Sequence, residues 1–444
     1  MNNDFIVKTD GFSGLGIAPA IYDVLIKLHF KHPTPIQKLA IPIAMEGKDM
    51  VGIAQTGTGK TLAFGIPMIQ RLCKSKGRGL IVLPTRELAM QVDEALRQVG
   101  AGLGLRTAVI IGGAAMRPQL QAIAKDPHII IATPGRLNDY LQQRIVKLDR
   151  VCIIILDEAD RMLDMGFAPQ IQKIFHTLPK ERQVMLFSAT IPPEITKMAA
   201  TYMKLPIRVE VAPTETTVEQ VTQEIFIIRK EDKIRLVEKL LQQYSGTTLI
   251  FTRTKHGAKR LTKAMRGIGH TAAEIHSNRS LSQRRDALEG FKSGKYRVLI
   301  ATDIASRGID VVGIELVINY DLPTNTEDYV HRIGRTARAG ADGHAISFMM
   351  PDQRAELRDI ERLIKKIIPV SEVSDLPPHR APQFLTARPQ GLEHLRQYPR
   401  SGGSLPRRSG SDHAGGSHRH RSPYRPSQSS KSYGRGRFYC RASE

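Results

Sequence analysis

One short stretch of the chain has the residue types and the spacing of a phosphate-binding loop. Residues 54–61 read AQTGTGKT, and they lie between the apolar run 50–53 and a predicted helix that begins at Leu62. The glycines of such a turn let backbone N–H groups point inward, where the positive end of the following helix also favours a polyphosphate. Lys60 can then reach the β- and γ-phosphates of a nucleotide, and the Thr61 hydroxyl can bind Mg²⁺. The residues expected to bind the nucleotide here are Ala54, Gln55, Thr56, Gly57, Thr58, Gly59, Lys60 and Thr61. The generic pattern opens with glycine where this chain has alanine, and a chance turn rich in Gly and Thr is the alternative interpretation.

An acidic pair stands at the end of another apolar run. Asp157 and Glu158 follow the run 151–156. Carboxylates at the end of a buried strand, beside a phosphate loop, are suited to hold a metal ion and to activate water. Asp157 is therefore the candidate for Mg²⁺, held partly through water, and Glu158 is the candidate base that deprotonates the attacking water. Without that context, two such carboxylates can be only the acidic start of a helix.

A proline-containing turn upstream of the loop supplies candidate contacts to a base. Residues 29–37 read HFKHPTPIQ, and the two prolines rule out a continuous helix and restrict the residues before them. The Gln37 amide both donates and accepts hydrogen bonds, so it can read an adenine edge, and Phe30 can stack on the base. A turn without a ligand is the ordinary alternative.

These candidate residues lie beside apolar runs, which identifies the elements that must position them. Short β-branched runs separated by helix-compatible stretches are typical of a parallel sheet covered on both faces, with its chemistry at the carboxyl ends of the strands. The predicted strands of a first domain are 50–53, 79–83, 107–111, 128–132, 151–156 and 183–187. Those of a second domain, which has no phosphate loop, are 223–228, 247–251, 270–275, 296–301, 315–320 and 344–349.

Clusters of polar residues follow most of these strands. In the first domain they are PTREL (84–88), the pair 112–113, TPGR (133–136), DEAD (157–160) and SAT (188–190). In the second domain they are FTRTKHGA (251–258), ATDIASRGID (301–310) and HRIGRTARAG (331–340). A stretch rich in Pro, Thr and Glu, 211–219, is the predicted linker between the two domains.

The charge of the chain favours a polyanionic partner. The formal net charge is +22 and the isoelectric point is near 10.0, although a basic surface without a function is the alternative. Residues 377–444 contain 13 Lys and Arg against 3 Asp and Glu, and their apolar periodicity stops, so we predict a disordered tail. Its aromatic residues stand among arginines, which is typical of binding to single-stranded nucleic acid. A merely solubilising tail is the alternative.

The remaining composition narrows the class of protein. The three cysteines share no metal-ligand spacing, so a disulfide framework or a structural zinc site is not expected. The N-terminus has no apolar signal core, and no apolar run approaches the length that a membrane span needs. We expect a cytoplasmic protein with no membrane partner.

Taken together, these motifs resemble the DEAD-box family of ATP-dependent RNA helicases, in helicase superfamily 2. The resemblance runs in order from Phe12 to about Asp375, which is most of the chain. It implies an α/β fold of two tandem RecA-like domains with parallel sheets, joined by a short linker and followed by the disordered basic tail. The implied divisions are a Q-motif segment (1–40), a helicase ATP-binding domain (41–212), a linker (213–220), a helicase C-terminal domain (221–376) and the tail (377–444).

The resemblance also implies a role for individual residues. The implied nucleotide contacts outside the phosphate loop are Phe12, Phe30 and Gln37 for adenine and Asp310 for the ribose. The implied catalytic residues are Lys60, Asp157 and Glu158, with Arg335 and Arg338 as arginine fingers. The residues implied to couple hydrolysis to strand separation are Asp160, Ser188, Thr190 and His331, the last of which, with Arg332, holds the finger motif in place. The implied RNA-backbone contacts are Pro84, Thr85, Arg86, Gly113, Thr133, Pro134, Gly135, Arg136, Arg253, Thr302 and Asp303.

The implied activity is RNA-stimulated ATP hydrolysis, coupled to local, non-processive unwinding of short RNA duplexes and to remodelling of ribonucleoproteins. Contacts to the backbone and the 2′-hydroxyl explain a preference for RNA without sequence reading. The segments FTRTKHGA and LDEADRMLDMGF (156–167), with the short basic tail, resemble the bacterial RhlE-type subgroup. That resemblance implies work in ribosome assembly, RNA decay or cold adaptation, with ribosomal RNA, pre-ribosomal particles or the RNA-decay machinery as partners.

The sequence departs from the family pattern at four positions. His29, Ser277 and Ala337 stand where the family prefers Gly, and Leu281 stands where it usually has Gln, which leaves one contact of that motif open. Two other functions are also open at this point. A DNA-directed translocase shares the two-domain core but should lack the Gln37 segment, and an ATP-gated RNA clamp would turn over slowly despite the intact catalytic residues.

Overall fold

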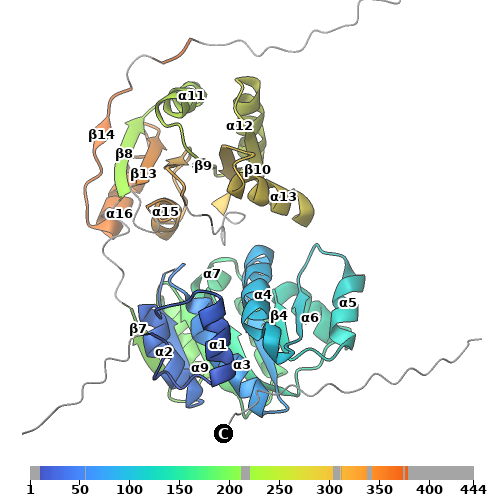
Figure 1. Ribbon diagram of the computed structural model, residues 1–444. Helices are drawn as coiled ribbons and strands as arrows, with labels where there is room; N and C mark the ends of the chain where they lie inside the picture. The colour runs from blue at the N-terminus through green and yellow to red at the C-terminus, as the bar shows by residue number, and fades with distance from the viewer. Residues whose placement is uncertain are drawn as a thin grey trace, which may run out of the picture. The chain divides into compact units, whose positions relative to one another are not determined.

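The computed structural model describes residues 11–55, 57–211, 221–303, 311, 313–337, 343–373 and 376–378. In these residues the chain forms two α/β domains, each built on one seven-stranded parallel sheet with helices packed against it (Figure 1). The predicted fold class is therefore confirmed. The linker 213–220 and nearly all of the tail lie outside the described residues.

The first domain contains the strands β1 to β7 and the helices before and between them. Its sheet has the order β3-β4-β2-β5-β6-β1-β7, and every neighbouring pair is parallel. The strands are β1 (Met50–Ile53), β2 (Arg78–Val82), β3 (Thr107–Ile110), β4 (Ile129–Ala132), β5 (Val151–Leu156), β6 (Gln183–Ser188) and β7 (Ile207–Glu210). The helices are α1 (Pro19–Lys27), α2 (Pro35–Met45), α3 (Lys60–Lys74), α4 (Arg86–Gly100), the 3-10 turn η1 (Ala101–Leu103), α5 (Met116–Ala124), α6 (Pro134–Gln142), α7 (Ala159–Asp164), α8 (Ala168–His176) and α9 (Pro193–Tyr202).

The second domain repeats this plan. Its parallel sheet has the order β10-β11-β9-β12-β13-β8-β14. The strands are β8 (Val221–Ile227), β9 (Thr248–Phe251), β10 (Ala272–Ile275), β11 (Val298–Ala301), β12 (Leu316–Asn319), β13 (Gly343–Met349) and β14 (Val370–Ser371). The described helices are α11 (Lys233–Gln243), α12 (Lys255–Gly267), α13 (Leu281–Lys292), α15 (Thr326–Ile333) and α16 (Arg354–Ile364).

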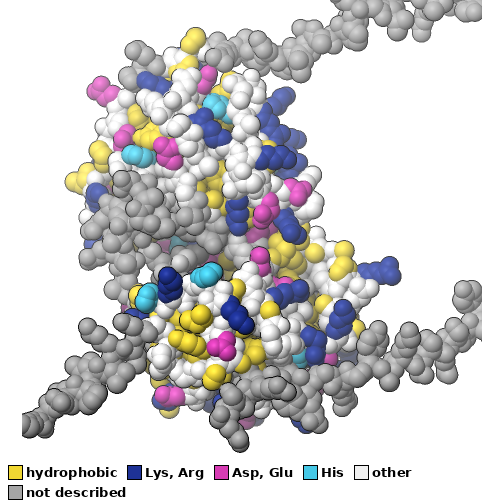
Figure 2. Space-filling model, in the orientation of Figure 1, with side chains coloured by type: hydrophobic (Ala, Val, Ile, Leu, Met, Phe, Trp, Pro, Cys, Tyr) yellow, Lys and Arg dark blue, Asp and Glu magenta, His cyan; other side chains and the backbone are white. Residues whose placement is uncertain are grey.

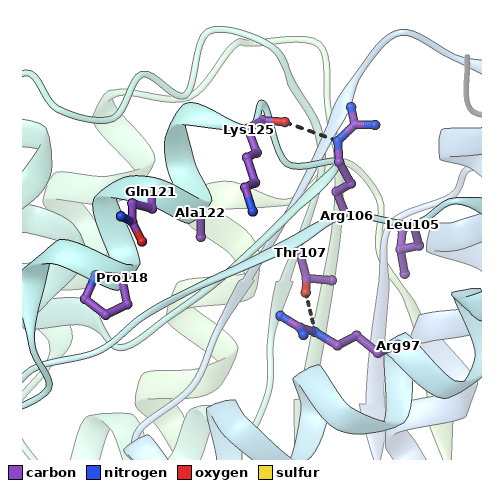
Figure 3. A pocket seen from close by; sticks show the side chains of 8 residues that line it. All are labelled: Arg97, Leu105, Arg106, Thr107, Pro118, Gln121, Ala122 and Lys125. Carbon is purple, nitrogen blue, oxygen red and sulfur yellow. Dashed lines mark hydrogen bonds between the residues drawn. The ribbon is translucent and has the colours of Figure 1, made fainter. Parts of the chain in front are cut away.

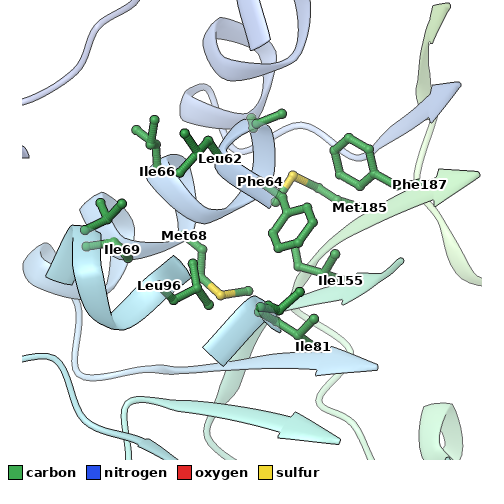
Figure 4. Close-up of a cluster of buried hydrophobic side chains, with 14 of the residues drawn as sticks. Leu62, Phe64, Ile66, Met68, Ile69, Ile81, Leu96, Ile155, Met185 and Phe187 are labelled. Carbon is green, nitrogen blue, oxygen red and sulfur yellow. The ribbon is translucent and has the colours of Figure 1, made fainter. Parts of the chain in front are cut away.

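The buried side chains of the first sheet alternate between two cores, one on each face. Along β5, Ile153 and Ile155 belong to the core under α1 to α4, whereas Ile154 belongs to the core on the opposite face. Figure 4 shows the first of these cores, in which Phe64 of α3 packs against Phe187 of β6 with ring centroids 5.4 Å apart. Continuous apolar strands are therefore required, since both faces of the sheet are covered.

The structure differs from the sequence prediction at the edges of the elements. The helix after the phosphate loop begins at Lys60 rather than Leu62, because Gly59 takes a left-handed conformation with a φ of 90° and ends the loop there. The outermost strands β7 and β14 were not predicted. Each is short and lies at a sheet edge, where pairing on one side alone leaves only a weak apolar pattern.

Candidate functional site

The strand order of the first domain divides its polar clusters into two neighbouring groups. The phosphate loop follows β1, the SAT segment follows β6 and the DEAD segment follows β5, and these three strands are consecutive in the sheet. The clusters 84–88, 133–136 and 112–113 follow β2, β4 and β3, which form the other half. Because parallel strands all end at one edge, the nucleotide candidates and the RNA candidates lie side by side along that edge.

The phosphate loop has the backbone that its glycines predict. Gly57 and Gly59 have φ values of 88° and 90°, in the left-handed region that favours glycine. Lys60 is buried, and its Nζ donates to the Ala54 carbonyl oxygen at 3.0 Å. The Ala54 N–H in turn donates to the Ser188 carbonyl oxygen, which ties the loop to β6. Thr61 is the second residue of α3, whereas Thr56 lies outside the described residues.

Gln37 supports this loop directly. Its Nε2 donates to the Gly59 carbonyl oxygen at 2.9 Å, and its Oε1 accepts the Thr34 backbone N–H at 3.0 Å. A Cβ at Gly59 would collide with the Gln37 amide, so the close approach requires glycine. Phe30 is exposed, whereas Phe12, the other aromatic residue predicted to contact adenine, is buried in the hydrophobic core.

Asp157 and Glu158 are both buried at the carboxyl end of β5. The Glu158 N–H donates to Asp157 Oδ1 at 3.0 Å. Burial raises the pKa of Asp157 to about 6, and the nearby charge of Lys60 opposes this rise. Glu158 has a φ of 53°, and its Oε2 lies 3.0 Å from Arg161 Nη1 in an ion pair that is almost completely buried. A buried carboxylate whose ionised form is stabilised mainly by a lysine is suited to accept a further cation, so this donor set fits Mg²⁺.

Asp160 links the DEAD segment to the SAT segment. Its Oδ2 accepts hydrogen bonds from the backbone N–H of Ala189 and of Thr190 at 3.0 Å, and from Thr190 Oγ1 at 3.2 Å. Its own N–H donates to Ser188 Oγ at 3.3 Å. Burial would raise the pKa of Asp160, but the charge of Lys60, the backbone hydrogen bond and charge of Arg161, and the backbone hydrogen bond of Thr190 outweigh it, so the pKa is lowered.

The RNA candidates of the first domain cluster at the ends of β2, β3 and β4. Thr85 caps α4, Arg86 is the first residue of that helix, and the Arg86 guanidinium lies over Gly113, where any Cβ would collide with it. Gly113 has a φ of 68°. On the neighbouring strand Pro134 starts α6, and Thr133, Gly135 and Arg136 adjoin it. Arg136 packs over the Tyr140 ring at 5.5 Å from its centroid.

In the second domain a buried arginine joins several of the candidate segments. Arg332 of α15 forms a bidentate pair with Asp303, with N···O distances of 2.6 and 2.8 Å. It also donates to Asn319 Oδ1 at 3.1 Å and to the Asp321 carbonyl oxygen at 2.7 Å. The Asp303 carboxylate, predicted as an RNA contact, is therefore engaged by Arg332. The role implied for Arg332, to hold the finger motif in place, stays a prediction.

The other candidates of this domain occupy the same strand ends. Arg253 is exposed after β9; its N–H donates to Asp321 Oδ2 at 3.0 Å and its Nη2 to the Leu322 carbonyl oxygen at 3.3 Å. Thr302 follows β11. Arg335 is buried, and its Nε donates to the His331 carbonyl oxygen at 3.2 Å. The remaining predicted contacts, Asp310 and Arg338, lie outside the described residues.

Three partners in these networks were missed by the sequence prediction. Arg161 stands three residues after Glu158 on one helix face, and that spacing alone could have indicated the pair. Asn319 and Asp321 lie at and just after the carboxyl end of β12, where the rule that found the other clusters also applies. Their side chains are ordinary polar residues that form no motif, so only the fold reveals their partners.

A separate cavity of about 320 Å³ lies at the opposite end of β3 (Figure 3). It is lined by Arg97 of α4, by Arg106 and Thr107 at the start of the strand, and by Gln121 and Lys125 from α5 and its end. Arg97 donates to Thr107 Oγ1 at 3.0 Å and pairs with Asp93, so much of its charge is already compensated. The cavity is thus distinct from the edge that carries the predicted motifs. In the described part of the chain, no helix has the length and apolar character needed to cross a lipid bilayer.

Two family models match the chain. The DEAD/DEAH box helicase model matches residues 34–198, and the helicase conserved C-terminal domain model matches residues 232–340. Together they cover the phosphate loop, the DEAD and SAT segments, and the segments around Asp303 and Arg332.

Named relatives and solved structures give the same result. The chain is 42% identical over 357 residues to "ATP-dependent rRNA helicase RRP3" of Mycosarcoma maydis, an alignment that covers 80% of this chain and 64% of that protein. It is 40% identical to "ATP-dependent RNA helicase CshA" of Listeria monocytogenes, covering 80% of this chain and 69% of the relative. The structure of S. cerevisiae Dbp5 bound to RNA and ADP BeF3 is similar with a TM-score of 0.72 and 29% identity, covering 82% of this chain and 95% of Dbp5. The structure of Mss116p bound to ssRNA and AMP-PNP is similar with a TM-score of 0.74 and 28% identity, covering 81% and 78%. The chain therefore belongs to the DEAD-box family of ATP-dependent RNA helicases.

Proposed function

We propose that this chain hydrolyses ATP in response to RNA and uses the cycle to separate short duplexes locally and to remodel ribonucleoproteins. The observation that carries the proposal is a set of hydrogen bonds that connects the segments predicted to bind the nucleotide in the first domain. Gln37 holds Gly59, Ala54 is bonded to Ser188, and Asp160 holds Thr190. A change at the phosphate loop can therefore be transmitted to the SAT segment through hydrogen bonds and without a flexible connection. The RNA-bound structures of Dbp5 and Mss116p support RNA as the partner.

At the ATP site we propose that the loop amides and Lys60 bind the phosphates, with Phe30 and Gln37 near the base and Asp310 at the ribose. Asp157 and Thr61 would hold Mg²⁺, which when bound neutralises phosphate charge. Glu158 would take the proton of the attacking water. Arg335 and Arg338 are proposed to supply the guanidinium groups that stabilise the transferred phosphoryl group, a contribution worth roughly 10³–10⁵ in rate.

We propose that RNA contacts the first domain through the ends of β2, β3 and β4, and the second through the ends of β9 and β11. The proposed domain limits are 41–212 and 221–376, with the Q-motif segment 1–40 before them and the linker 213–220 between them. The described strands of the two sheets, Met50–Glu210 and Val221–Ser371, support these limits.

For the biological setting we propose a cytoplasmic helicase of the RhlE-type subgroup that acts in ribosome assembly, RNA decay or cold adaptation. The identity to a protein named as an rRNA helicase supports ribosomal RNA or pre-ribosomal particles as substrates. The amino-acid sequences of the segments 156–167 and 251–258 support the RhlE-type subgroup.

The decisive experiment replaces the proposed base by Glu158→Gln, which keeps the shape of the side chain but removes its basicity. We expect RNA-stimulated ATP turnover to fall by at least about 10², the range for general base catalysis, while ATP-dependent RNA binding persists. Unchanged turnover would remove Glu158 from this role. In the parental protein, equal stimulation by DNA and RNA would instead indicate a DNA-directed enzyme, and RNA retention with little turnover would indicate a clamp.

A further inference from the structure

Helix α12 carries a concentration of positive charge that the proposed site does not use. Its thirteen residues, Lys255–Gly267, contain five cations and no acidic residue. The cations are Lys255, Lys259, Arg260, Lys263 and Arg266. By contrast, α16 interleaves both signs and forms the pair Arg362–Asp359 on its surface.

The charge of α12 has no acidic counterpart in the described part of the chain. None of the ion pairs formed among the described residues uses a side chain of this helix. The contacts that its cations do make are neutral: Lys255 Nζ donates to Asn278 Oδ1 at 3.2 Å, and Arg266 Nε donates to the Ala272 carbonyl oxygen at 2.8 Å. Lys259 and Lys263 are exposed to solvent.

This arrangement opposes the formation of the helix itself. Lys255, Lys259 and Lys263 are spaced four residues apart, so like charges lie next to one another on one face. Two of them also stand in the first half of the helix, near the positive end of its dipole. The helix is held instead by its apolar face, where Ala258, Leu261 and Met265 are buried in the core of the second domain. A charge pattern that disfavours folding indicates a partner outside the domain.

The exposed face has the shape and chemistry of a phosphate track. Four residues of helix rise by about 6 Å, close to the distance between successive phosphates of a nucleic-acid strand, so the three lysines form a line with a matching repeat. Figure 2 shows Lys and Arg side chains following one another down the side of the second domain that carries α12. The helix begins directly after Arg253 and Thr254, at the edge proposed to bind RNA.

The same face lacks what other partners need. Protein interfaces have an apolar or aromatic centre, and none of the described exposed large hydrophobic residues belongs to α12. A helix that binds a lipid surface inserts an apolar face, but the apolar face of α12 is already buried.

We propose that the line Lys255, Lys259 and Lys263, termed the α12 ridge, binds the backbone phosphates of an RNA duplex arm that flanks the strand held at the motif edge. This inference rests on the proposed function, because the strand at that edge brings the arm to the helix. The ridge would add affinity for duplex-flanked substrates without reading their sequence.

The test uses the full chain and the variant Lys259→Glu, with Lys366→Glu as the control. Lys366 is an exposed lysine after α16, so the control makes the same charge change elsewhere in the domain. Two RNAs are compared: a short single strand that covers only the motif edge, and the same strand extended by a duplex arm. We expect Lys259→Glu to weaken binding of the extended RNA about fivefold and to lower its log–log salt slope by about one, as when one phosphate is no longer neutralised. Binding of the short strand, and its stimulation of ATP hydrolysis, should be unchanged.

Two further readouts separate this proposal from general effects. Lys259→Glu places opposite charges next to Lys255 and Lys263, so its thermal midpoint should not fall, and a loss of RNA affinity cannot then be attributed to unfolding. If the control weakens the extended RNA equally, or if Lys259→Glu weakens both RNAs equally, the ridge is not the site. If even the short strand fails to stimulate hydrolysis by the parental protein, the proposed function fails independently of α12.

Discussion

Glu158 turns the chain from β5 into α7 through a left-handed backbone conformation, with φ of 53° and ψ of 50°. This conformation costs an L-residue roughly 1–2 kcal/mol, so the surroundings must hold it in place. The ion pair with Arg161 does so, because both side chains are only 3% exposed and the N···O distance is 3.0 Å. Arg161 thus fixes the position of the proposed base.

Arg161 should therefore control the rate of hydrolysis more than the binding of ATP. Arg161→Lys keeps the charge but shortens the reach and removes the planar fork, so the Glu158 carboxylate should shift. We expect kcat to fall at least about tenfold with little change in KM for ATP, since small misplacements of reacting groups are costly. Steady-state kinetics with saturating RNA measure this.

A purely structural role for Arg161 makes a different prediction. Removing one partner of a buried ion pair costs about 3–5 kcal/mol, so Arg161→Met should lower the free energy of unfolding strongly. When Arg161→Met is introduced into Glu158→Gln instead, no buried carboxylate is left unpaired, so the free energy of unfolding should fall much less. If Arg161→Lys retained full kcat while the stability cycle behaved as stated, the pair would support the fold alone.

His29 and Ala337 show which local features sequence comparison can and cannot reveal. Both stand where the family prefers glycine, and both adopt positive φ, of 61° and 51°. The substitutions were visible in the sequence, but the retained left-handed backbone was not. Ser277, the third such position, is not among the described residues with positive φ. A left-handed backbone therefore explains the family's preference for glycine at two of these positions but not at Ser277.

Removing the methyl group at Ala337 should be less harmful than the same change in a helix. Ala264→Gly, inside α12, should destabilise by about 1 kcal/mol through helix propensity. Ala337→Gly relieves the left-handed strain, so its loss should be smaller by roughly 1–2 kcal/mol. Chemical denaturation of both variants measures the difference, and equal losses would show that Ala337 is not strained.

At the scale of elements, the strands that carry motifs were predictable because they are buried on both faces. The runs at 151–156 and 50–53 match β5 and β1 without a change of boundary. The placement of polar clusters at strand ends followed from parallel topology, and the strand order then determined which clusters are neighbours. That order could not be read from the sequence, since it depends on tertiary packing among strands of nearly equal apolar character.

The connection between α5 and β4 should make the first domain sensitive to acid. His128 Nδ1 accepts the Arg106 backbone N–H at 3.0 Å, which requires a neutral ring. Burial, and then the charge of Arg106, lower the pKa of His128 from 6.5 to about 4. A group whose pKa is lower in the folded state contributes stability above its unfolded pKa and loses it as the pH falls toward the folded pKa.

We therefore expect the free energy of unfolding to decline between about pH 6.5 and pH 4. Each pKa unit of this shift corresponds to at most about 1.36 kcal/mol. Because the side chain is partly exposed, solvent screening reduces the total, and the His128 contribution should be roughly 1–2 kcal/mol. In His128→Asn the amide oxygen can still accept the Arg106 N–H but does not titrate. Urea unfolding at both ends of this range should show a weaker pH dependence in the variant. An identical pH dependence would locate the acid sensitivity elsewhere.

The neighbouring carboxylate Asp126 does not confuse this test. Burial alone would raise the pKa of Asp126, but Arg150 and Arg78 lower it, so Asp126 loses its contribution to stability only at lower pH.

For the whole molecule, positive charge is the property that no single motif explains. Of the net charge of +22, the residues 377–444 contribute +10, and α12 contributes +5. The chemistry of hydrolysis needs few of these charges, because the predicted catalytic cations are only Lys60, Arg335 and Arg338. The supporting residue Arg332 is compensated by Asp303. The excess is therefore available for RNA phosphates outside the motif edge.

A chain that ends before Arg400 should separate these contributions. It lacks most of the arginines of the tail and the four aromatic residues Tyr424, Tyr433, Phe438 and Tyr439, so both charge and base stacking are removed. We expect weaker RNA binding and a shallower salt dependence, by about 0.7 in log–log slope for each phosphate that the tail no longer neutralises. The kcat at saturating RNA should stay the same, because the predicted catalytic residues all precede residue 339.

A tail with the same composition in shuffled order should restore RNA binding if charge and stacking suffice. Unaltered affinity of the truncated chain at low salt would show that the tail serves solubility alone, and failure of the shuffled tail would show that its order is read.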